Sequence, residues 1–231
     1  MHMTGLAVVI GSGGGIGAAI QRELESSGQF ERVLGVSRSS EPKLDLLDEA
    51  SIAQCAGGIS GQGAEIRFVI DATGALVLDG HRPEKSLRDL DPEALANSFA
   101  VNAIGPALLM KHFLPLLPRS GRSVFATLSA RVGSIGDNRL GGWYAYRASK
   151  AALNQLVHTA AVELARRKPG AICVALHPGT VRTPLTEGFA KTGLEVQEPE
   201  VASRRLLAVC DGLTSEQSGG FFDHHGKAVP W

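Results

Sequence analysis

The sequence has few cysteines, no excess of charge of either sign and few aromatic side chains. Its three cysteines, Cys55, Cys173 and Cys210, are odd in number, widely spaced and form no Cys-x-x-Cys pair. This pattern favours buried free thiols in a reducing compartment over disulfides, so we expect a cytoplasmic protein. The 23 basic and 23 acidic side chains cancel, which leaves no global field to attract a polyanion such as nucleic acid.

A long unbroken hydrophobic run is also missing from the early part of the chain. The most apolar early stretch, residues 6–20, lacks a basic flank and is interrupted by glycines and a serine. It fits neither a signal peptide nor a membrane-spanning helix, and no membrane attachment is expected.

The chain instead alternates short apolar runs with segments of helical periodicity. Continuous apolar runs are typical of strands buried on both faces, as in a parallel sheet covered by helices. Because 231 residues fit one α/β domain and no linker or repeat interrupts the alternation, residues 1–231 are predicted to form a single domain with a doubly wound parallel sheet flanked by helices. The predicted strands are 6–10, 32–37, 67–72, 123–129 and 172–177, and the predicted helices are 16–26, 50–55, 92–117, 144–168 and 199–211.

A glycine-rich turn after the first predicted strand is the first candidate site. Gly11, Gly15 and Gly17 follow residues 6–10 and open the first predicted helix with the spacing G-x3-G-x-G. Such glycines permit a tight turn and let backbone amides approach a pyrophosphate at the helix N-terminus. A structural turn without a ligand is the alternative, and the absence of Lys-Ser/Thr after Gly17 excludes a Walker-type phosphate loop.

Two later positions bear on which nucleotide this turn would bind. At the end of the second predicted strand, where an acidic residue would bind a ribose 2′-hydroxyl, the chain has Ser37 and Arg38. These side chains suit a 2′-phosphate, although a plain surface arginine is the alternative. Asp45 suits an adenine contact and a turn about equally. NADP(H) is therefore favoured over NAD(H).

Only two tyrosines occur in the chain, and both lie at the start of the fourth predicted helix. Tyr146 and Lys150 are four residues apart and share a face of that helix, a face that Tyr144 does not share. A neighbouring ammonium lowers the pKa of a phenol, so this pair could exchange a proton near neutral pH, as the interconversion of a carbonyl and an alcohol requires. A surface pair is the alternative for an isolated Tyr-x3-Lys.

Three further positions favour a catalytic Tyr146–Lys150 pair over a surface pair. Ser129 ends the strand predicted at 123–129, so its hydroxyl lies at the carboxyl edge of the sheet, where a substrate oxygen could be held. Asn102 lies within the helix predicted at 92–117, where an amide is a poor helix former and a solvated face is its usual interpretation. Thr183 follows the chain break at Pro178-Gly179 and is available to a carboxamide.

Taken in order, these elements resemble the single-domain type of the short-chain dehydrogenase/reductase family. The resemblance covers nearly the whole chain and rests on GSGGGIG, DATG at residues 71–74, VNAIGP around Asn102, the strand-end serine, Tyr-x3-Lys and HPGTVRT. The stretches GGWYAYRASKAALN and HPGTVRTPL and the ending FFDHHGKAVPW are most similar to the branch that includes C-factor and Sniffer-type carbonyl reductases.

The resemblance implies a Rossmann fold and hydride transfer between NADP(H) and an aldehyde, ketone or quinone. It makes Tyr146 the general acid or base, and it makes Lys150 the residue that lowers the pKa of Tyr146 and holds the nicotinamide ribose. Ser129 would orient the carbonyl, and Asn102 would support a proton relay through water. The residues implied to contact the cofactor are Gly11, Ser12, Gly13, Gly15, Ile16, Gly17, Ser37, Arg38, Asp45, Leu46, Ala72, Thr73, Gly74, Asn102, Tyr146, Lys150, Pro178, Gly179, Val181 and Thr183.

The chain also departs from the family pattern. Ile10 stands where a threonine often precedes the first glycine, so a turn-stabilising hydrogen bond is missing or replaced. DATG replaces Asn-Asn-Ala-Gly, which leaves open how the sheet is fixed there. Gly14 occupies a position that is basic in many NADP-using members, so Arg38 is the main support for NADP(H). No metal is expected, because His224-His225 lacks a third ligand at a sensible spacing.

A nucleotide-binding regulatory protein of the same fold, with little or no turnover, is the alternative function, and an epimerase or dehydratase is a third. We expect residues 76–90, 131–142 and 184–198 to form the substrate pocket. Residues 183–196 are expected to act as a lid, and the substrate is expected to be a small carbonyl compound or alcohol. The two long helices often form a four-helix interface in this family, so a homodimer or homotetramer is expected, with a monomer as the alternative.

Overall fold

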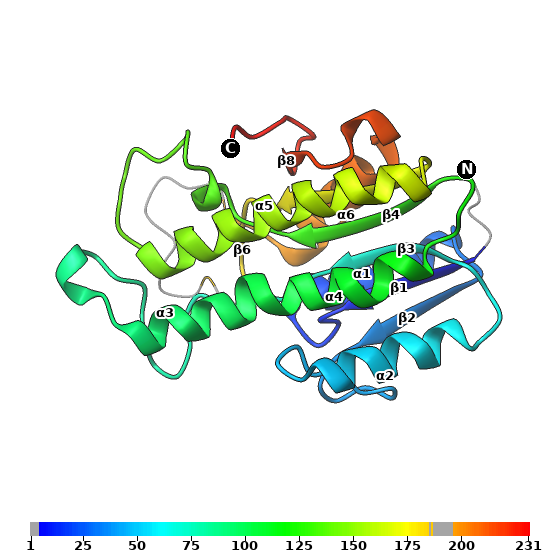
Figure 1. Ribbon diagram of the computed structural model, residues 1–231, viewed down its shortest axis with the longest axis horizontal. Helices are drawn as coiled ribbons and strands as arrows, with labels where there is room; N and C mark the ends of the chain where they lie inside the picture. Colours follow the sequence, from blue (N-terminus) through cyan, green and yellow to red (C-terminus); the bar gives the residue numbers. More distant parts are fainter. Residues whose placement is uncertain (1–4, 185, 187–195) are drawn as a thin grey trace.

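The computed structural model describes residues 5–184, 186 and 196–231. Its centre is a six-stranded sheet in the order β2-β1-β3-β4-β5-β8, with every neighbouring pair parallel (Figure 1). Because β2 and β3 lie on opposite sides of β1, the chain winds in both directions from β1, which confirms the predicted doubly wound α/β fold. The strands are β1 Leu6–Ile10, β2 Arg32–Val36, β3 Ile66–Asp71, β4 Ser123–Leu128, β5 Ala171–His177 and β8 Phe221–Asp223, with a small separate pair β6 Thr180–Val181 and β7 Val196–Gln197.

Helices cover both faces of the sheet. In Figure 1, α2, α4 and α5 lie in front of the strands, and α1 and α6 lie behind them. Successive residues of a strand point to opposite faces, so β1 divides its buried side chains between two cores: Val8 and Ile10 pack toward α2, α4 and α5, and Ala7 and Val9 pack toward α1 and α6. The α-helices are α1 Gly15–Ser27, α2 Glu49–Ser60, α3 Pro92–Phe99, α4 Gly105–Phe113, α5 Tyr144–Arg167 and α6 Pro199–Gly212.

The helix predicted at 92–117 is interrupted. Between α3 and α4 the backbone forms a π-helical stretch, Ala100–Ile104, and after α4 it tightens into a 3-10 turn, Leu114–Leu116. A π-turn inserts extra backbone into one turn of a helix and rotates the side chains there relative to the flanking α-helices. Asn102 lies in this stretch. Further 3-10 turns are Leu87–Asp89, Arg131–Gly133 and Ser215–Gln217.

By length and composition alone, the stretch Pro92–Leu116 could cross a membrane. Within this domain the same stretch packs over the sheet between α2 and α5 (Figure 1). Leu109 and Phe113 are fully buried in the core that lies between these helices and the strands. The stretch is therefore accounted for as a core helix of the domain.

Two elements differ from the sequence prediction in extent. α2 continues to Ser60, well beyond the predicted end at residue 55, and its start is capped by Asp48, which accepts the Ala50 N–H at 2.9 Å. Gly57 and Gly58 lie inside this helix and hide its periodicity. β8 was not predicted, because three residues carry no readable period and its pairing with β5 is what makes it a strand.

Candidate functional site

The glycine-rich turn lies between the carboxyl ends of β1 and β3, where the strand order reverses. Gly11 has a left-handed backbone, with φ +83°. Its N–H donates to the Val36 carbonyl at 2.9 Å, and the Ser12 N–H donates to the same oxygen at 3.2 Å. These two bonds tie the turn to the end of β2.

Side chains would not fit at two glycines of this turn, Gly15 and Gly17. A Cβ on Gly15 would lie 2.9 Å from Cγ2 of Thr183, and a Cβ on Gly17 would collide with the carbonyl oxygen of Gly11. The N-cap residue of α1, Gly14, has no side chain to cap the helix. The first-turn N–H groups, including that of Ile16, can therefore receive an anion, and the site fits the pyrophosphate of a dinucleotide.

The residues after β2 flank this turn. Ser37 lies beside Gly13, where an added Cβ would be 3.7 Å from the serine Cβ, and Arg38 is exposed next to it. Asp45 accepts the Leu47 N–H at 3.1 Å, so its carboxylate serves the local turn. The Leu46 side chain packs closely against α4 at Gly105.

The DATG element fixes the sheet through a buried carboxylate. Asp71 is fully buried at the end of β3 and accepts hydrogen bonds from the Thr127 hydroxyl at 2.7 Å, the Thr73 hydroxyl at 2.5 Å and the Thr73 N–H at 2.9 Å. Burial raises the pKa of Asp71, while these hydrogen bonds and the charge of Lys150 lower it. The carboxylate therefore joins β3 to β4 in place of the family's asparagine.

Asn102 faces the site, and its interpretation as a solvated side chain is wrong. It is fully buried, accepts the Ala75 N–H at 3.0 Å and donates to the Ala75 carbonyl at 2.9 Å. The π-helical stretch turns the amide inward, toward the loop after β3. A Cβ on Gly74 would lie 3.3 Å from both the Asn102 amide oxygen and the Lys150 ammonium, so these two side chains converge beside that loop.

Tyr146 and Lys150 lie on one face of α5, as predicted. The Lys150 side chain is buried; its ammonium donates to the Leu128 carbonyl at 2.9 Å and lies 5.9 Å from the centroid of the Tyr146 ring. Burial lowers the pKa of Lys150 to about 8, an effect that the charge of Asp71 partly offsets. Burial also raises the pKa of Tyr146. This direction is opposite to the lowering expected from a neighbouring ammonium.

Ser129 follows β4 directly and faces α5. Its N–H donates to the Leu176 carbonyl at 2.8 Å, and its hydroxyl donates to the amide oxygen of Asn154 at 2.7 Å. Asn154 lies one turn beyond Lys150, and the sequence analysis missed it. The signal was present in the spacing, since Tyr146, Lys150 and Asn154 recur every four residues along one face.

Two serines connect the site residues and were also missed. The Ser149 hydroxyl donates to the Tyr146 carbonyl at 3.0 Å and lies 3.2 Å from the Ser98 hydroxyl. Asn102 donates to the Ser98 oxygen at 3.4 Å. This buried network links the π-helical stretch to the backbone at Tyr146.

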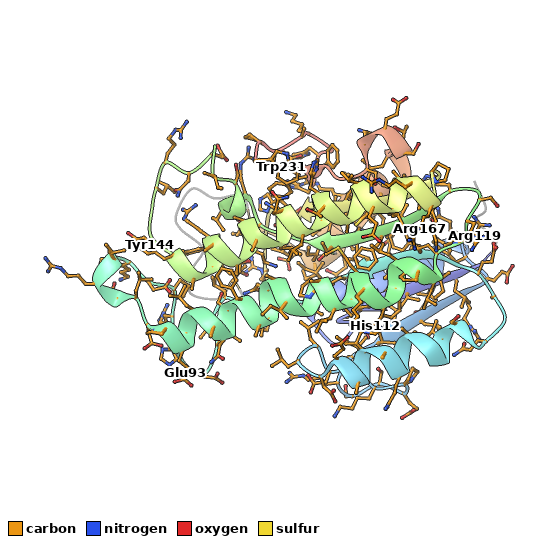
Figure 2. All side chains as sticks on the ribbon, in the orientation of Figure 1. Glu93, His112, Arg119, Tyr144, Arg167 and Trp231 are labelled. Carbon is orange, nitrogen blue, oxygen red and sulfur yellow. The ribbon has the colours of Figure 1, made fainter. Side chains whose placement is uncertain are left out.

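The start of α5 is held from both flanking loops. Glu84, which is buried, accepts the Ala145 N–H with its carboxylate and the Trp143 N–H, at 2.6 Å, with its carbonyl. Trp143 has a left-handed backbone, with φ 54°, and its ring meets the Tyr146 ring edge-on at 6.3 Å. Arg147 donates to the Gly142 carbonyl at 2.9 Å. Figure 2 shows that Tyr144 lies at this end of α5.

The loop after β5 reaches back to the glycine-rich turn. Gly179 has φ +79°, the Pro178 carbonyl accepts the Gln197 amide at 2.5 Å, and Val181 is buried in β6. Thr183 touches the Gly15 position, as described above. Of the predicted lid at 183–196, residues 185 and 187–195 lie outside the described residues.

His177, before this loop, is neutral at physiological pH. Its burial, followed by the charges of His224 and Arg131, lowers the pKa of His177 to about 4. Within the described parts of the chain, no three metal-ligating side chains gather in one place.

Comparison with known proteins decides the family. A family described as enoyl-(acyl carrier protein) reductase matches residues 14–210. The 1-hydroxy-2-glutathionyl-2-methyl-3-butene dehydrogenase of Rhodococcus sp. strain AD45 is 30% identical over 233 residues, which cover 97% of this chain and 98% of that enzyme. The chain belongs to the short-chain dehydrogenase/reductase family. The resemblance seen in the sequence is thereby confirmed, and with it membership of a family of oxidoreductases.

Further known proteins are similar to this chain in sequence or in fold. C-signal of Myxococcus xanthus is 40% identical over 147 residues, which cover 63% of this chain and 84% of that protein. The NADPH-bound carbonyl reductase from chicken fatty liver superposes with a TM-score of 0.86 at 24% identity, over 100% of both chains. The carbonyl reductase Sniffer of D. melanogaster gives 0.85 at 22% identity, also over 100% of both chains.

Proposed function

We propose that this protein is an NADP(H)-dependent oxidoreductase that interconverts a carbonyl compound, an aldehyde, ketone or quinone, and its alcohol. The observation that carries the proposal is the convergence of Asn102 and Lys150 on Gly74. This places the face of α5 that bears Tyr146 against the loop after β3, which itself packs on the turn at Gly11. A proton donor and a dinucleotide cradle thus share one edge of the sheet.

The cofactor assignment follows from which residues fit it. The glycine-rich turn and the first turn of α1 would hold the pyrophosphate, and Ser37 and Arg38 would hold the 2′-phosphate. Lys150 would hold the nicotinamide ribose, and Val181 and Thr183 the carboxamide. The NADPH in the chicken carbonyl reductase, a protein of the same fold, is consistent with this assignment. The bound cofactor supplies the hydride.

Tyr146 supplies the proton. The phenol of Tyr146 is protonated at neutral pH, because its pKa is about 10 even in water and burial raises it further, so it has a proton to donate to a carbonyl oxygen. The ammonium of Lys150 stabilises the phenolate that remains after the transfer. Ser129 holds the substrate oxygen, and Asn102 supports the return of a proton to the phenol through water.

The test compares two tyrosines on one helix. Tyr146→Phe should lower kcat for NADPH oxidation with an aldehyde, ketone or quinone by about 10³-fold, within the usual range for a lost general acid. NADPH binding, followed by fluorescence titration, should be retained. Tyr144→Phe is the matched control, because Tyr144 is partly exposed and lies on another side of α5. Equal activity of the two variants would contradict the assignment.

A second candidate is a nucleotide-binding regulatory protein of the same fold, with little or no turnover. The 40% identity to C-signal favours it. Purified protein that binds NADPH but turns over none of a broad panel of carbonyl compounds would support this candidate over the oxidoreductase.

We also propose that α4 and α5 form the interface of a homodimer or homotetramer. Their outer surface carries a groove with a largely apolar lining, and Leu156 on its rim is 38% exposed. Leu156→Glu should convert the assembly into monomers in sedimentation velocity, whereas a wild-type protein that already sediments as a monomer would contradict the proposal. Residues that line the groove include Ala107, Met110, Leu114, Leu156, Ala160 and Leu164.

The cytoplasm is the proposed location. Cys55, Cys173 and Cys210 are all free and buried, as expected for a reducing compartment. Cell fractionation that found the protein outside the cytoplasm would contradict this.

A further inference from the structure

The hydrogen bond between Ser129 and Asn154 has a direction, and that direction limits what Ser129 can do. The Ser129 hydroxyl donates to the Asn154 amide oxygen at 2.7 Å, and the two residues are 4% and 2% exposed. A serine hydroxyl has one hydrogen to give and two lone pairs to offer. In this arrangement the hydrogen is used by Asn154, so Ser129 can only accept a hydrogen bond from a ligand.

The other half of the Asn154 amide is unsatisfied. Its Nδ2 is buried, and among the described residues it has no hydrogen-bond partner. A buried amide hydrogen without an acceptor costs on the order of 1–3 kcal/mol, so it requires an explanation. The amide oxygen and nitrogen have nearly the same shape. Rotating the amide by half a turn therefore places Nδ2 against the Ser129 oxygen without disturbing the packing around the side chain.

The rotated arrangement changes the role of Ser129. Nδ2 then donates to the serine oxygen, and the serine hydrogen is released toward the substrate. Each orientation leaves part of the amide unpaired in the protein alone, and a substrate oxygen that accepts the serine hydrogen favours the rotated one. The backbone of Ser129 does not take part, because its N–H is held by Leu176. Only the hydroxyl and the amide need to turn.

Resting on the proposed function, we propose that Asn154 is the positioning residue that switches Ser129 between acceptor and donor. Negative charge grows on the substrate oxygen as a carbonyl is reduced, and a hydrogen-bond donor placed there stabilises that charge. Asn154 with Nδ2 toward Ser129 makes the serine such a donor. With its oxygen toward Ser129, it makes the serine an acceptor for the hydroxyl of an alcohol.

The test uses Asn154→Asp, which keeps the shape of the side chain but changes its hydrogen bonding. An ionised carboxylate can only accept, so it holds the serine hydrogen permanently. At neutral pH, kcat should fall by about 10²-fold, the usual cost of losing one donor to a developing oxyanion. When the carboxyl group is protonated it can donate again, so kcat should recover as the pH is lowered. Wild-type enzyme should show no such recovery.

Asn154→Ala separates this role from packing. It leaves a cavity but frees the Ser129 hydroxyl, so kcat should fall by less than about 10-fold, well under the expected loss of a full donor. An aspartate that is more harmful than an alanine is the reverse of what lost packing predicts. In a Ser129→Ala background the aspartate should cause little further loss, because the group it acts through is gone. NADPH affinity should be unchanged throughout.

Three results would overturn the proposal. Asn154→Asp could be as active as wild type at neutral pH, or its kcat could fail to recover at lower pH. Asn154→Asp could also lower kcat by the same factor in the Ser129→Ala background as in the wild type. A wild type without turnover, or full activity in Tyr146→Phe, would instead overturn the proposed function.

A further measurement does not depend on the variant folding. In wild-type protein labelled with 15N, the Asn154 side-chain NH2 signal should shift when NADP+ and cyclohexanone, a non-reacting pair, are added together, and an unmoved signal would also overturn the proposal.

Discussion

The carboxylate of Glu84 lies 3.2 Å from the backbone nitrogen of Ala145, which is 61 residues later in the chain. It satisfies a first-turn N–H of α5 that the N-cap residue, Trp143, cannot satisfy, because an indole only donates hydrogen bonds. The charge also suits the positive end of the helix. The helix that carries Tyr146 therefore begins where a distant loop holds it.

Removing this cap should loosen α5 at its functional end. Glu84→Ala leaves the Ala145 N–H buried and unpaired, which costs about 2 kcal/mol and lowers the Tm by about 4–8 °C for a domain of this size. kcat should fall with it, because Tyr146 lies in the loosened turn. Glu84→Gln keeps an acceptor oxygen, so it should retain most of the thermal stability and most of kcat. Thermal unfolding and steady-state kinetics measure the two effects.

The matched control is Asp48→Ala, which removes a cap of the same kind from α2. α2 carries no proposed catalytic residue, so this variant should lose about 1 kcal/mol of stability with kcat unchanged. If Glu84→Ala likewise lowered the Tm and left kcat intact, the cap would be purely structural.

The pH dependence of turnover should report the charge of Lys150. Burial lowers the pKa of Lys150 to about 8, and the ammonium is the working form, so kcat/KM should decrease as the pH rises through that value. The charge of Asp71 raises the pKa of Lys150. Asp71→Asn removes that charge, so the decrease should begin at lower pH. Thr127→Val keeps the charge while removing one hydrogen bond, and should leave the decrease near its original position. A profile unaffected by Asp71→Asn would show that the two buried charges are not coupled.

Arg38 should determine the choice between NADPH and NADH. A charge-assisted hydrogen bond to a phosphate contributes about 1.5–3 kcal/mol, so Arg38→Ala should weaken NADPH binding by about 10- to 100-fold and leave NADH binding nearly unchanged. Fluorescence titration with each dinucleotide measures this. Arg22→Ala removes an exposed arginine on α1 that is paired with Glu200, and it should change neither NADPH binding nor NADH binding. Equal losses for both dinucleotides would exclude a contact with the 2′-phosphate.

Gly15 should be intolerant of a side chain for a specific reason. Gly15→Ala brings a Cβ to 2.9 Å from Cγ2 of Thr183, so NADPH binding should weaken. Thr183→Ser lacks that methyl group, and the double variant should recover affinity relative to Gly15→Ala. Gly57→Ala in α2, where an added Cβ meets nothing within 4 Å, should stabilise the protein by about 0.5–1 kcal/mol without affecting binding. If the effects of Gly15→Ala and Thr183→Ser on NADPH affinity were simply additive, the steric conflict at Gly15 would involve an atom other than Cγ2 of Thr183.

Much of the fold was readable from the sequence because burial on both faces leaves a direct mark. Five of the six central strands were predicted within one or two residues, since each is a continuous apolar run. β8 was missed because its three residues, Phe221–Asp223, become a strand only by pairing with β5. The end of α2 was missed because Gly57 and Gly58 interrupt its apolar stripe without interrupting its backbone.

The site residues likewise divide into those that local sequence identifies and those that only tertiary contacts reveal. Spacing alone put Tyr146 and Lys150 on one face, because four residues complete about one turn of any helix. For Asn102 the residue type alone suggested a solvated face, and only the resemblance placed it in the site; the structure buries it, because a π-helical stretch shifts the phase of that helix. Asn154 pairs with Ser129, Ser149 with Ser98 and Glu84 with Ala145, all far away in sequence, and no local pattern could identify those partners.

The sequence by itself determined the order of strands and helices, the glycines of the turn and the residues that share a face of α5. These properties depend on local periodicity and on side-chain volume. Only the tertiary structure decided which side chain Ser129 is paired with, what caps α5, and whether the phenol of Tyr146 is made more or less acidic. Those properties depend on desolvation and on contacts between distant segments, which arise only when the chain has folded.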